Sequence, residues 1–332
     1  MKILITGSNG FVGSHIAETL TEKGHQVVCL VRHSSNCKWL DCLKTATSRS
    51  TGIEKRVGDV THPKTLCEAV KGVDAVIHSA GVLRARDPEF YYHVNRDGTK
   101  NLVEAILEHN PKLKKLIYIS SQAAMGPSPE LRPKQIGEPE NPVSDYGRSK
   151  LAGEKEVEAL RGKVPFTILR PAAVYGPRDK DIFIFFQFVN LGLRPRTLAK
   201  RYFQLVFVKD IAEAAIRAID TSAADYNTYF LADNSPYTWE EAAREIASAA
   251  GRKTIPLPVP DFAFKTAGFL AGIIARFQGK PAVLNDQKIT EFLQTFWLAD
   301  TSTAQKDLGM DFTKLKNGAR ITYSWYKQHK WL

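Results

Sequence analysis

The sequence predicts an α/β protein: a doubly wound parallel sheet joined to a smaller, mainly helical C-terminal lobe. Short apolar runs alternate with helical patterns through the first half of the chain, and the alternation weakens beyond Pro177. A glycine-rich turn joins the first apolar run to the first helical pattern. The 332 residues are 43% hydrophobic and 24% charged, so the chain can bury a sizeable core.

The first strand and helix frame the most informative turn. Residues 3–5 form a continuous apolar run, typical of a strand buried on both faces of a parallel sheet. Gly7 allows a tight turn, Gly10 the close approach of a pyrophosphate, and Gly13 close packing of helix on strand. The helix start offers N–H groups and the positive end of its dipole. A glycine turn without a ligand is the alternative, but its place between strand and helix favours dinucleotide binding.

The remaining elements follow in order. Further strands are expected at residues 26–31, 54–57, 74–78, 115–120 and 166–170, and helices near 36–43, 61–70, 89–108 and 146–160. Residues 127–142 are rich in proline and glycine and predict a surface loop. Residues 206–219 and 228–231 predict a helix and a strand that rejoin the sheet. Thr238 and Glu241 predict a capping box at the start of another helix.

Charge and composition exclude several classes of protein. The net charge is +11, but the basic residues are scattered and no nucleic-acid module is visible, so no nucleic-acid partner is expected. Four cysteines without a C-x-x-C pair indicate a reduced, cytoplasmic compartment, and eight histidines without zinc-type spacing predict no metal. No apolar run is long enough to span a bilayer, and the first residues indicate a buried strand rather than a signal peptide.

The spacing of Tyr146 and Lys150 predicts the chemistry. Four residues apart on a helix, they point the same way. A free phenol has a pKa of about 10, and a neighbouring ammonium lowers it. We therefore expect Tyr146 to move a proton to or from a substrate oxygen while a hydride moves to or from carbon, and Lys150 to hold a ribose hydroxyl. Ser121, after the fifth strand, is expected to align that oxygen, with Ser120 as the weaker candidate.

Other segments at strand ends and in one helix are candidates for cofactor contacts. An acid and an apolar side chain follow the third strand, where they can meet the adenine amino group and ring. Small residues end the fourth strand, where ligands bind in open α/β sheets. An asparagine in the next helical pattern can fix the backbone near the active centre. Each residue also has a purely structural interpretation. These candidates are Asp59, Val60, Ser79, Ala80, Gly81 and Asn95.

Together these motifs resemble the extended short-chain dehydrogenases/reductases of the NAD-dependent epimerase/dehydratase superfamily. The matching segments span about the first 180 residues, in order: 6–13, 58–60, 78–81, 95–101, 118–121, 146–150 and 170–177. The resemblance implies Ser121, Tyr146 and Lys150 as the catalytic set, and a homodimer. It also implies cofactor contacts from Asn9, Phe11, Val12, Pro171, Ala173 and Val174, the last three at the nicotinamide end.

Two domains follow from the pattern. Residues 1–177 are expected to form a Rossmann-type dinucleotide-binding domain, which 205–232 rejoin, and 178–332 mainly a substrate-binding lobe.

The end of the second strand predicts the choice of cofactor. An acid there would bind the ribose hydroxyls of NAD, but this chain has Val31 followed by Arg32. A guanidinium at Arg32 can pair with a 2′-phosphate, and Ser34 can add a hydroxyl donor. We therefore predict NADP(H) rather than NAD, the alternative being a solvated loop arginine.

One departure from the family's usual sequence and two apolar segments predict the kind of substrate. Nucleotide-sugar enzymes of the family usually place an asparagine where this chain has Ala173, which argues against a nucleotide sugar. The aromatic runs at 182–189 and 262–277 suit a pocket for an apolar molecule, although each residue taken singly is more typical of ordinary core. Residues 268–277 also leave a peripheral membrane contact open. The pattern resembles dihydroflavonol-reductase-like and hydroxysteroid-dehydrogenase-like enzymes.

The sequence thus predicts a cytoplasmic NADP(H)-dependent oxidoreductase. Its substrate is expected to be a small, mostly apolar molecule on which a secondary alcohol and a ketone or aldehyde are interconverted. Two alternatives remain: a nucleotide-sugar epimerase or dehydratase that keeps NAD bound, and a non-catalytic dinucleotide-binding sensor.

Overall fold

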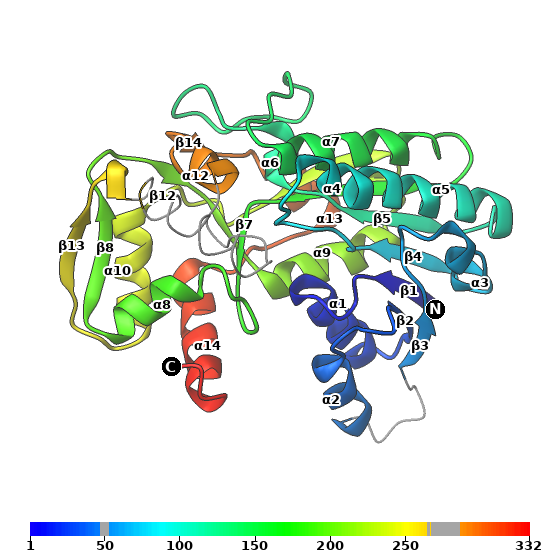
Figure 1. Cartoon of the computed structure of the whole chain (residues 1–332), viewed down its shortest axis with the longest axis horizontal. Coiled ribbons are helices and arrows are strands. Elements are labelled where there is room, and N and C mark those ends of the chain that lie inside the picture. Colours follow the sequence, from blue (N-terminus) through cyan, green and yellow to red (C-terminus); the bar gives the residue numbers. More distant parts are fainter. Residues whose placement is uncertain (47–52, 264–265, 267–285) are drawn as a thin grey trace.

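A parallel sheet forms the centre of the protein (Figure 1). The structure, a computed structural model, describes residues 1–46, 53–263, 266 and 286–332. Seven strands lie in the order β11-β6-β5-β4-β1-β2-β3, and every neighbouring pair is parallel. The strands are β1 (Lys2–Thr6), β2 (Gln26–Val31), β3 (Glu54–Val57), β4 (Ala75–His78), β5 (Lys115–Ile119), β6 (Phe166–Pro171) and β11 (Asn227–Leu231).

The strand order reverses between β1 and β4. From β1 the chain builds outward through β2 to β3, then crosses back to place β4 on the other side of β1. Ligands of open α/β sheets bind at such a reversal, beyond the carboxyl ends of the strands. Here the backbone N–H of Ser79 donates to the carbonyl of Thr6 at 3.2 Å, and that of Ala80 to the Thr6 hydroxyl at 3.2 Å. The ends of β1 and β4 are thereby fixed side by side.

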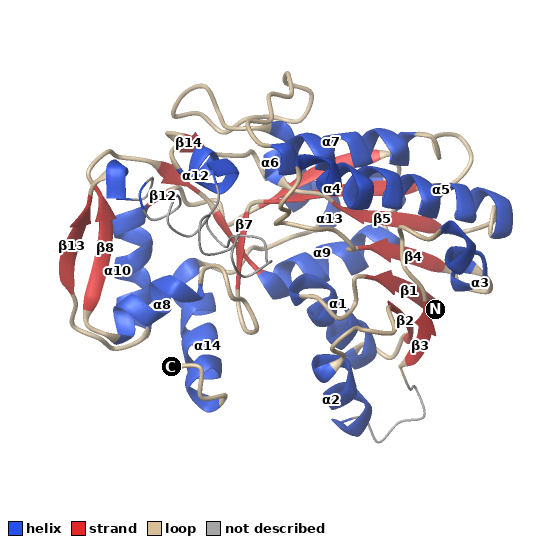
Figure 2. Cartoon of the chain, in the orientation of Figure 1, coloured by secondary structure: helices blue, strands red, loops and turns tan. Residues whose placement is uncertain are grey.

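Helices cover both faces of the sheet (Figure 2). On one face lie α1 (Phe11–Glu22) and α9 (Val208–Asp220). On the other lie α3 (Leu66–Val70), α5 (Gly98–His109) and α7 (Asp145–Glu158). These three layers confirm the predicted doubly wound α/β fold.

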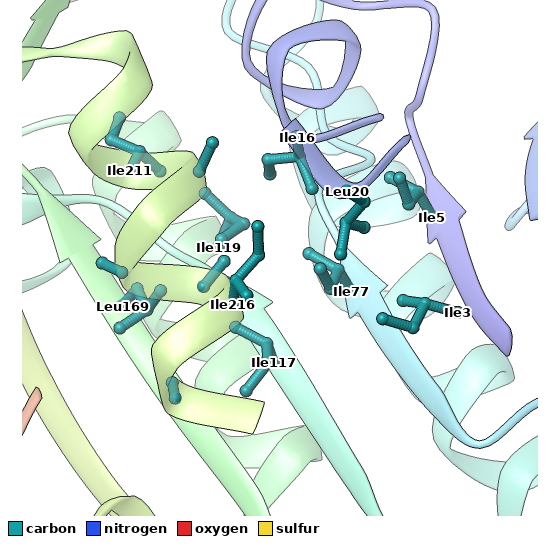
Figure 3. Close-up of a cluster of buried hydrophobic side chains, with 14 of the residues drawn as sticks. Ile3, Ile5, Ile16, Leu20, Ile77, Ile117, Ile119, Leu169, Ile211 and Ile216 are labelled. Atoms are coloured by element: carbon teal, nitrogen blue, oxygen red, sulfur yellow. The ribbon is translucent and has the colours of Figure 1, made fainter. Parts of the chain in front are cut away.

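Branched aliphatic side chains fill the space between the sheet and the first of these helix layers (Figure 3). Burying one such side chain contributes about 1.5–3 kcal/mol, so this layer is a main source of stability. The labelled residues come from strands β1, β4, β5 and β6 and from helices α1 and α9: Ile3, Ile5, Ile77, Ile117, Ile119, Leu169, Ile16, Leu20, Ile211 and Ile216.

The helix expected at residues 89–108 is not continuous. It consists of α4 (Pro88–Tyr92), a π-helical turn (His93–Asp97) and α5. Within the turn, Asn95 is fully buried and hydrogen-bonds the backbone of Val82. Single π-helical turns of this kind occur frequently at functional sites. Periodicity did not predict it because the hydrogen bonds that hold Asn95 come from a separate loop and from α7.

The C-terminal lobe contains short strands as well as helices. The sequence did not predict these strands, because two to five residues carry little periodic signal and prolines in β13 argue against a strand. The lobe comprises α8 (Phe183–Asn190), β8 (Leu193–Thr197), β9 (Tyr202–Phe203), β12 (Tyr237–Thr238), α10 (Trp239–Ala249), β13 (Ile255–Val259), α12 (Asp286–Phe292), β14 (Phe296–Trp297) and α14 (Leu315–Gln328). Other short elements are α2 (Lys38–Ala46), α6 (Gln122–Met125), β7 (Ala173–Tyr175), β10 (Leu205–Phe207) and α13 (Ser302–Leu308).

Two features of the lobe test expectations from the sequence. The capping box is confirmed, since the Thr238 hydroxyl accepts from the Glu241 N–H at 3.2 Å and the Glu241 carboxylate from the Thr238 N–H at 2.8 Å. The aromatic run at 182–189 contributes mainly to the core of the lobe: Phe186 is fully buried, and Phe185 stacks on Trp239 with centroids 4.9 Å apart.

The second apolar run is only partly described. Residues 264–265 and 267–285, which include 268–277, lie outside the described residues. Among the helices that are described, none combines the length and the apolar character needed to cross a bilayer.

The loop after β7 connects the lobe to the sheet domain. The Arg178 guanidinium donates to the Glu18 carboxylate on α1 at 3.0 Å, and the Tyr326 hydroxyl on α14 donates to the Asp179 carbonyl at 2.9 Å. The Asp179 side chain is 3% exposed and accepts from the N–H of Ile182 at 2.8 Å. Burial nevertheless raises the pKa of Asp179 to about 7.

Replacement of Asp179 by asparagine tests this burial. A raised pKa means that the fold favours the protonated acid, so its contribution to stability is present below the ordinary value of 3.8 and is lost as the pH rises through about 7. We expect the stability of Asp179→Asn relative to wild type to increase from pH 4.5 to pH 8, by about 3 kcal/mol. Urea unfolding at both pH values measures this, and exposed Asp311→Asn is the control. Equal shifts for both variants would contradict it.

Candidate active site

The glycine turn forms one wall of the site. Gly7 has φ +68°, and a Cβ there would lie 2.7 Å from the backbone of Ala80. A Cβ at Gly13 would lie 2.2 Å from the carbonyl oxygen of Gly7, so helix α1 contacts the turn directly. Gly10 caps α1 without a side chain, which leaves the first N–H groups of the helix for an anion. This donor set fits a pyrophosphate. The neighbouring Asn9, Phe11 and Val12 are half-buried.

The residues predicted to meet the adenosine lie at the ends of β2 and β3. Arg32 and Ser34 are exposed in the turn after β2, and the Arg32 guanidinium has no partner in the described part of the chain. The Asp59 carboxylate accepts from the N–H and the hydroxyl of Thr61, at 3.0 and 2.9 Å, both through Oδ1. Val60 is 4% exposed and belongs to the core. Its contact with an adenine ring stays a prediction.

Asn95 links three parts of the site. Its amide accepts from the Val82 N–H at 2.8 Å and donates to the Ser149 hydroxyl at 2.9 Å. A Cβ at Gly81 would lie 3.0 Å from Asn95 Oδ1 and 3.8 Å from Lys150 Nζ. The loop after β4, which also holds half-buried Ser79 and Ala80, is thus fixed against α7. All of these Asn95 bonds are to protein groups, so its direct contact with a cofactor stays a prediction.

Ser121, which directly follows β5, lies near enough to Tyr146 to affect its ionisation. The Ser121 hydroxyl caps α6 by accepting from the Ala123 N–H at 3.1 Å. Burial raises the pKa of the half-buried Tyr146, whereas the charge of Lys288 and hydrogen bonding with Ser121 lower it. The Ser120 hydroxyl instead donates to the Glu154 carboxylate, away from the phenol. The structure therefore separates the two serines, with Ser121 beside Tyr146.

Lys150 is placed differently from the simplest expectation. It is 4% exposed, and its Nζ donates to the carbonyl of Ile119 at 2.7 Å, 4.3 Å from the centroid of the Tyr118 ring. Burial lowers the pKa of Lys150 to about 7, against the charge of Glu154. The cation that lies over the Tyr146 ring is Lys288, with Nζ 5.3 Å from the centroid. The sequence predicted that Lys150 lowers the pKa of the phenol; in the structure the lysine whose charge lowers it is Lys288.

A buried ion pair joins helix α7, which carries Tyr146 and Lys150, to strand β6. The Arg170 guanidinium on β6 donates to both carboxylate oxygens of Glu154 on α7, at 2.9 and 2.5 Å, and to Glu140 at 3.0 Å. Arg170 and Glu154 side chains are 5% and 6% exposed. Bidentate Arg–carboxylate bonds fix orientation as well as distance. The pair therefore fixes the helix that carries Tyr146 and Lys150 against the sheet.

The segment predicted for the nicotinamide end begins where β6 ends. Pro171 is the last residue of β6 and is buried, while Ala173 and Val174 begin β7, which pairs with β10. Ala173 is exposed and Val174 half-buried. Exposed Ala173 offers no side-chain hydrogen-bond donor at this point.

Sequence reasoning missed Glu154 and Lys288. Glu154 lies four residues after Lys150, on the same helix face, so the spacing could have indicated it. Nothing local indicates Lys288, which is carried by α12 of the lobe. Within the described ranges, no group of three His, Cys, Asp or Glu side chains is placed to hold a metal ion.

Comparisons with known proteins identify one family model and several relatives. The model of the "NAD dependent epimerase/dehydratase family" matches residues 3–232. A ceramide reductase of Caulobacter vibrioides is 28% identical over 333 residues, covering 99% of this chain and 96% of that protein. A UDP-glucose 4-epimerase of Vibrio cholerae is 29% identical, covering 84% and 85%. A 2-alkyl-3-oxoalkanoate reductase of Stenotrophomonas maltophilia is 26% identical, covering 88% of each.

A solved structure confirms the fold. UDP-glucose 4-epimerase from Thermotoga maritima, crystallised with UDP-glucose, superposes with a TM-score of 0.79, covering 99% of this chain and 100% of that chain. At 20% identity this likeness concerns the fold alone.

The ion pair beneath the site gives a stability prediction. Glu154→Gln leaves the Arg170 charge buried with only Glu140 as an acidic partner, so we expect a loss of about 3 kcal/mol in the free energy of unfolding. Glu158→Gln on the same helix removes an exposed pair with Arg161 and should change it by less than about 1 kcal/mol. Urea unfolding of both variants measures the difference. Equal losses would show that the buried pair is no more stabilising than a surface one.

Proposed function

This chain belongs to the NAD dependent epimerase/dehydratase family, and we propose that it is an NADP(H)-dependent oxidoreductase. It is an enzyme with an NAD(P)-type dinucleotide cofactor, of the oxidoreductase or epimerase type. Its proposed reaction interconverts a secondary alcohol and a ketone on a small, mostly apolar molecule. The observation that carries this proposal is the placement of Ser121 near Tyr146 at the end of β5, with Lys150 on the same face of α7 as Tyr146.

The residues of the site divide the proton chemistry between them. In the reducing direction, Tyr146 gives its phenolic proton to the substrate oxygen and Ser121 donates a hydrogen bond to the same oxygen. A bound nicotinamide supplies the hydride that adds to the carbonyl carbon. Lys150, already oriented by the carbonyl of Ile119, binds a ribose hydroxyl. The oxidising direction reverses each step, with Tyr146 accepting the proton.

Two observations favour an apolar substrate over a nucleotide sugar. The side chain of Ala173 is exposed but cannot bond a diphosphate, where related nucleotide-sugar enzymes usually present an asparagine. The ceramide reductase matches nearly the whole of this chain. The likeness to UDP-glucose 4-epimerases keeps epimerisation with bound NAD as the second candidate.

The cofactor preference is supported by Arg32. Its exposed guanidinium follows β2 with no acid beside it, so it can pair with a 2′-phosphate.

Titration of the purified protein separates these candidates. We expect NADPH to bind more tightly than NADH, and little nucleotide to remain bound after purification. We also expect the protein to oxidise NADPH in the presence of ketones such as a 3-oxoalkanoate ester, a 3-oxo ceramide or a 3-ketosteroid. Retained NAD together with conversion of UDP-glucose would instead establish the epimerase.

Charge reversal at Arg32 tests the cofactor assignment. A carboxylate at this position repels the 2′-phosphate, so Arg32→Glu should weaken NADPH binding at least about tenfold, or roughly 1.4 kcal/mol, and leave NADH unaffected. Fluorescence titration of both cofactors measures this. Arg320→Glu, an exposed arginine on α14, is the matched control. Equal weakening of both cofactors would show that Arg32 does not recognise the phosphate.

Removal of one hydroxyl tests the catalytic assignment. Tyr146→Phe should lower the turnover of a responsive ketone about 10²–10⁴-fold, because it removes the proposed proton donor, while NADPH binding is retained. Tyr92→Phe, half-buried on α4, should retain turnover. Steady-state kinetics and cofactor titration measure both. Full turnover in Tyr146→Phe would favour a non-catalytic role for this tyrosine.

A further inference from the structure

Helix α12 of the lobe docks on the first turn of α7. The Gln287 side chain accepts from the N–H of Asp145 at 2.6 Å and donates to its carboxylate at 2.5 Å. The Glu291 carboxylate accepts from the Ser144 hydroxyl at 2.5 Å, and the Glu291 carbonyl accepts from Trp297 Nε1 at 2.7 Å. The bonds to Ser144 and Asp145 join α12, drawn in orange in Figure 1, to the residues immediately before Tyr146. Side chains from two distant parts of the chain are thereby fixed relative to each other.

The docking brings Lys288 over the phenol. Its Nζ lies 5.3 Å from the centroid of the Tyr146 ring and 2.9 Å from the Glu291 carboxylate. A cation within about 6 Å of an aromatic face is attracted to it. The attraction grows when the ring carries the negative charge of a phenolate. Burial lowers the pKa of the Lys288 ammonium, but the negative charges of Glu291 and Asp181 raise it by more. Lys288 therefore remains a cation.

The other charges around the phenol do not replace this contact. Glu291 and Tyr91 oppose ionisation of Tyr146, as does burial. Lys150, on the same helix, directs its Nζ to the carbonyl of Ile119. The titratable groups that face the phenol or adjoin it are Lys288 and Glu291 on α12, Tyr91 on α4, Tyr118 on β5 and Lys150 on α7.

We propose that Lys288 is a positioning residue for proton transfer, whose ammonium, held over the Tyr146 ring by α12, stabilises the phenolate left when the proton passes to the substrate oxygen. In that step the O–H bond of Tyr146 breaks, a new O–H bond forms on the substrate, and the hydride from NADPH adds to carbon. The role in turnover rests on the proposed function, whereas the effect of Lys288 on the phenol does not. The lobe thus contributes to the chemistry as well as to substrate binding.

A titration without substrate tests the electrostatic effect. Protein labelled with 3,5-difluorotyrosine reports the ionisation of each phenol by ¹⁹F NMR, and Tyr146→Phe assigns the signal. A unit charge about 5 Å away changes a pKa by about 0.6 to 2.4 units for effective dielectric constants between about 80 and 20. We expect Lys288→Gln to raise the Tyr146 pKa by an amount in this range, Lys288→Arg to leave it nearly unchanged, and Glu291→Gln to lower it.

A second lysine–tyrosine contact provides the control. Lys327 lies over the ring of Tyr323 on α14, with Nζ 5.9 Å from the centroid, so Lys327→Gln should leave the Tyr146 signal unchanged. An unchanged titration in folded Lys288→Gln, or shifts of the same sign in Lys288→Gln and Glu291→Gln, would overturn the proposal. If Lys288→Gln does not fold, Lys288→Met, which also removes the charge, decides in its place: a raised Tyr146 pKa supports the proposal, and an unchanged pKa overturns it.

Turnover adds an independent measurement. Ketone reduction requires the protonated phenol, so the rate falls above the pKa of Tyr146. For a ketone that the wild type reduces, Lys288→Gln should move this alkaline limb of kcat to higher pH and lower kcat at neutral pH. NADPH affinity should not change. An unmoved limb would overturn the proposal. If no ketone or alcohol is turned over, the proposed function fails, while the NMR titration still decides the role of Lys288 on the phenol.

Discussion

The contact between α1 and the glycine turn determines where most of the other parts lie. Because Gly13 has no side chain, its Cα can approach the carbonyl of Gly7, and α1 starts directly against the end of β1. The open N–H groups of the helix then face the reversal in strand order between β1 and β4. The same helix carries Glu18, which holds Arg178 of the loop leading into the lobe. This close backbone approach therefore positions both the glycine turn, where the dinucleotide is expected, and the loop that leads into the lobe.

Helix α7 is the second fixed element, and it is held from two sides. From the sheet side, Arg170 on β6 binds both carboxylate oxygens of Glu154, and both side chains are almost fully buried. From the lobe side, Gln287 and Glu291 bind the first turn. A phenol that must exchange a proton with a substrate needs a fixed position, because misplacement of a reacting group lowers rates steeply. Attachment at both ends supplies that rigidity.

The electrostatic environment of Tyr146 combines opposing effects. Burial and the nearby carboxylate favour the neutral phenol, whereas Lys288 and the hydrogen bond with Ser121 favour the phenolate. A general acid works best when its pKa lies near the working pH, so such a balance is what proton transfer requires. The buried Lys150, with its pKa lowered to about 7, is one turn away and differs from Lys288, whose pKa is raised. The two lysines therefore have different environments and, in our proposal, different roles.

Local sequence was sufficient to predict three arrangements: the strand–turn–helix at Gly7 to Gly13, the shared helix face of Tyr146 and Lys150, and the capping box at Thr238. Each depends on residues within a few positions of one another, where backbone geometry fixes which groups meet. The tertiary structure was needed to place Lys288 over Tyr146, because that contact depends on docking between segments far apart in the chain. It also decided that a π-helical turn interrupts the helix at Asn95, since the bonds that hold that residue come from a separate loop and helix.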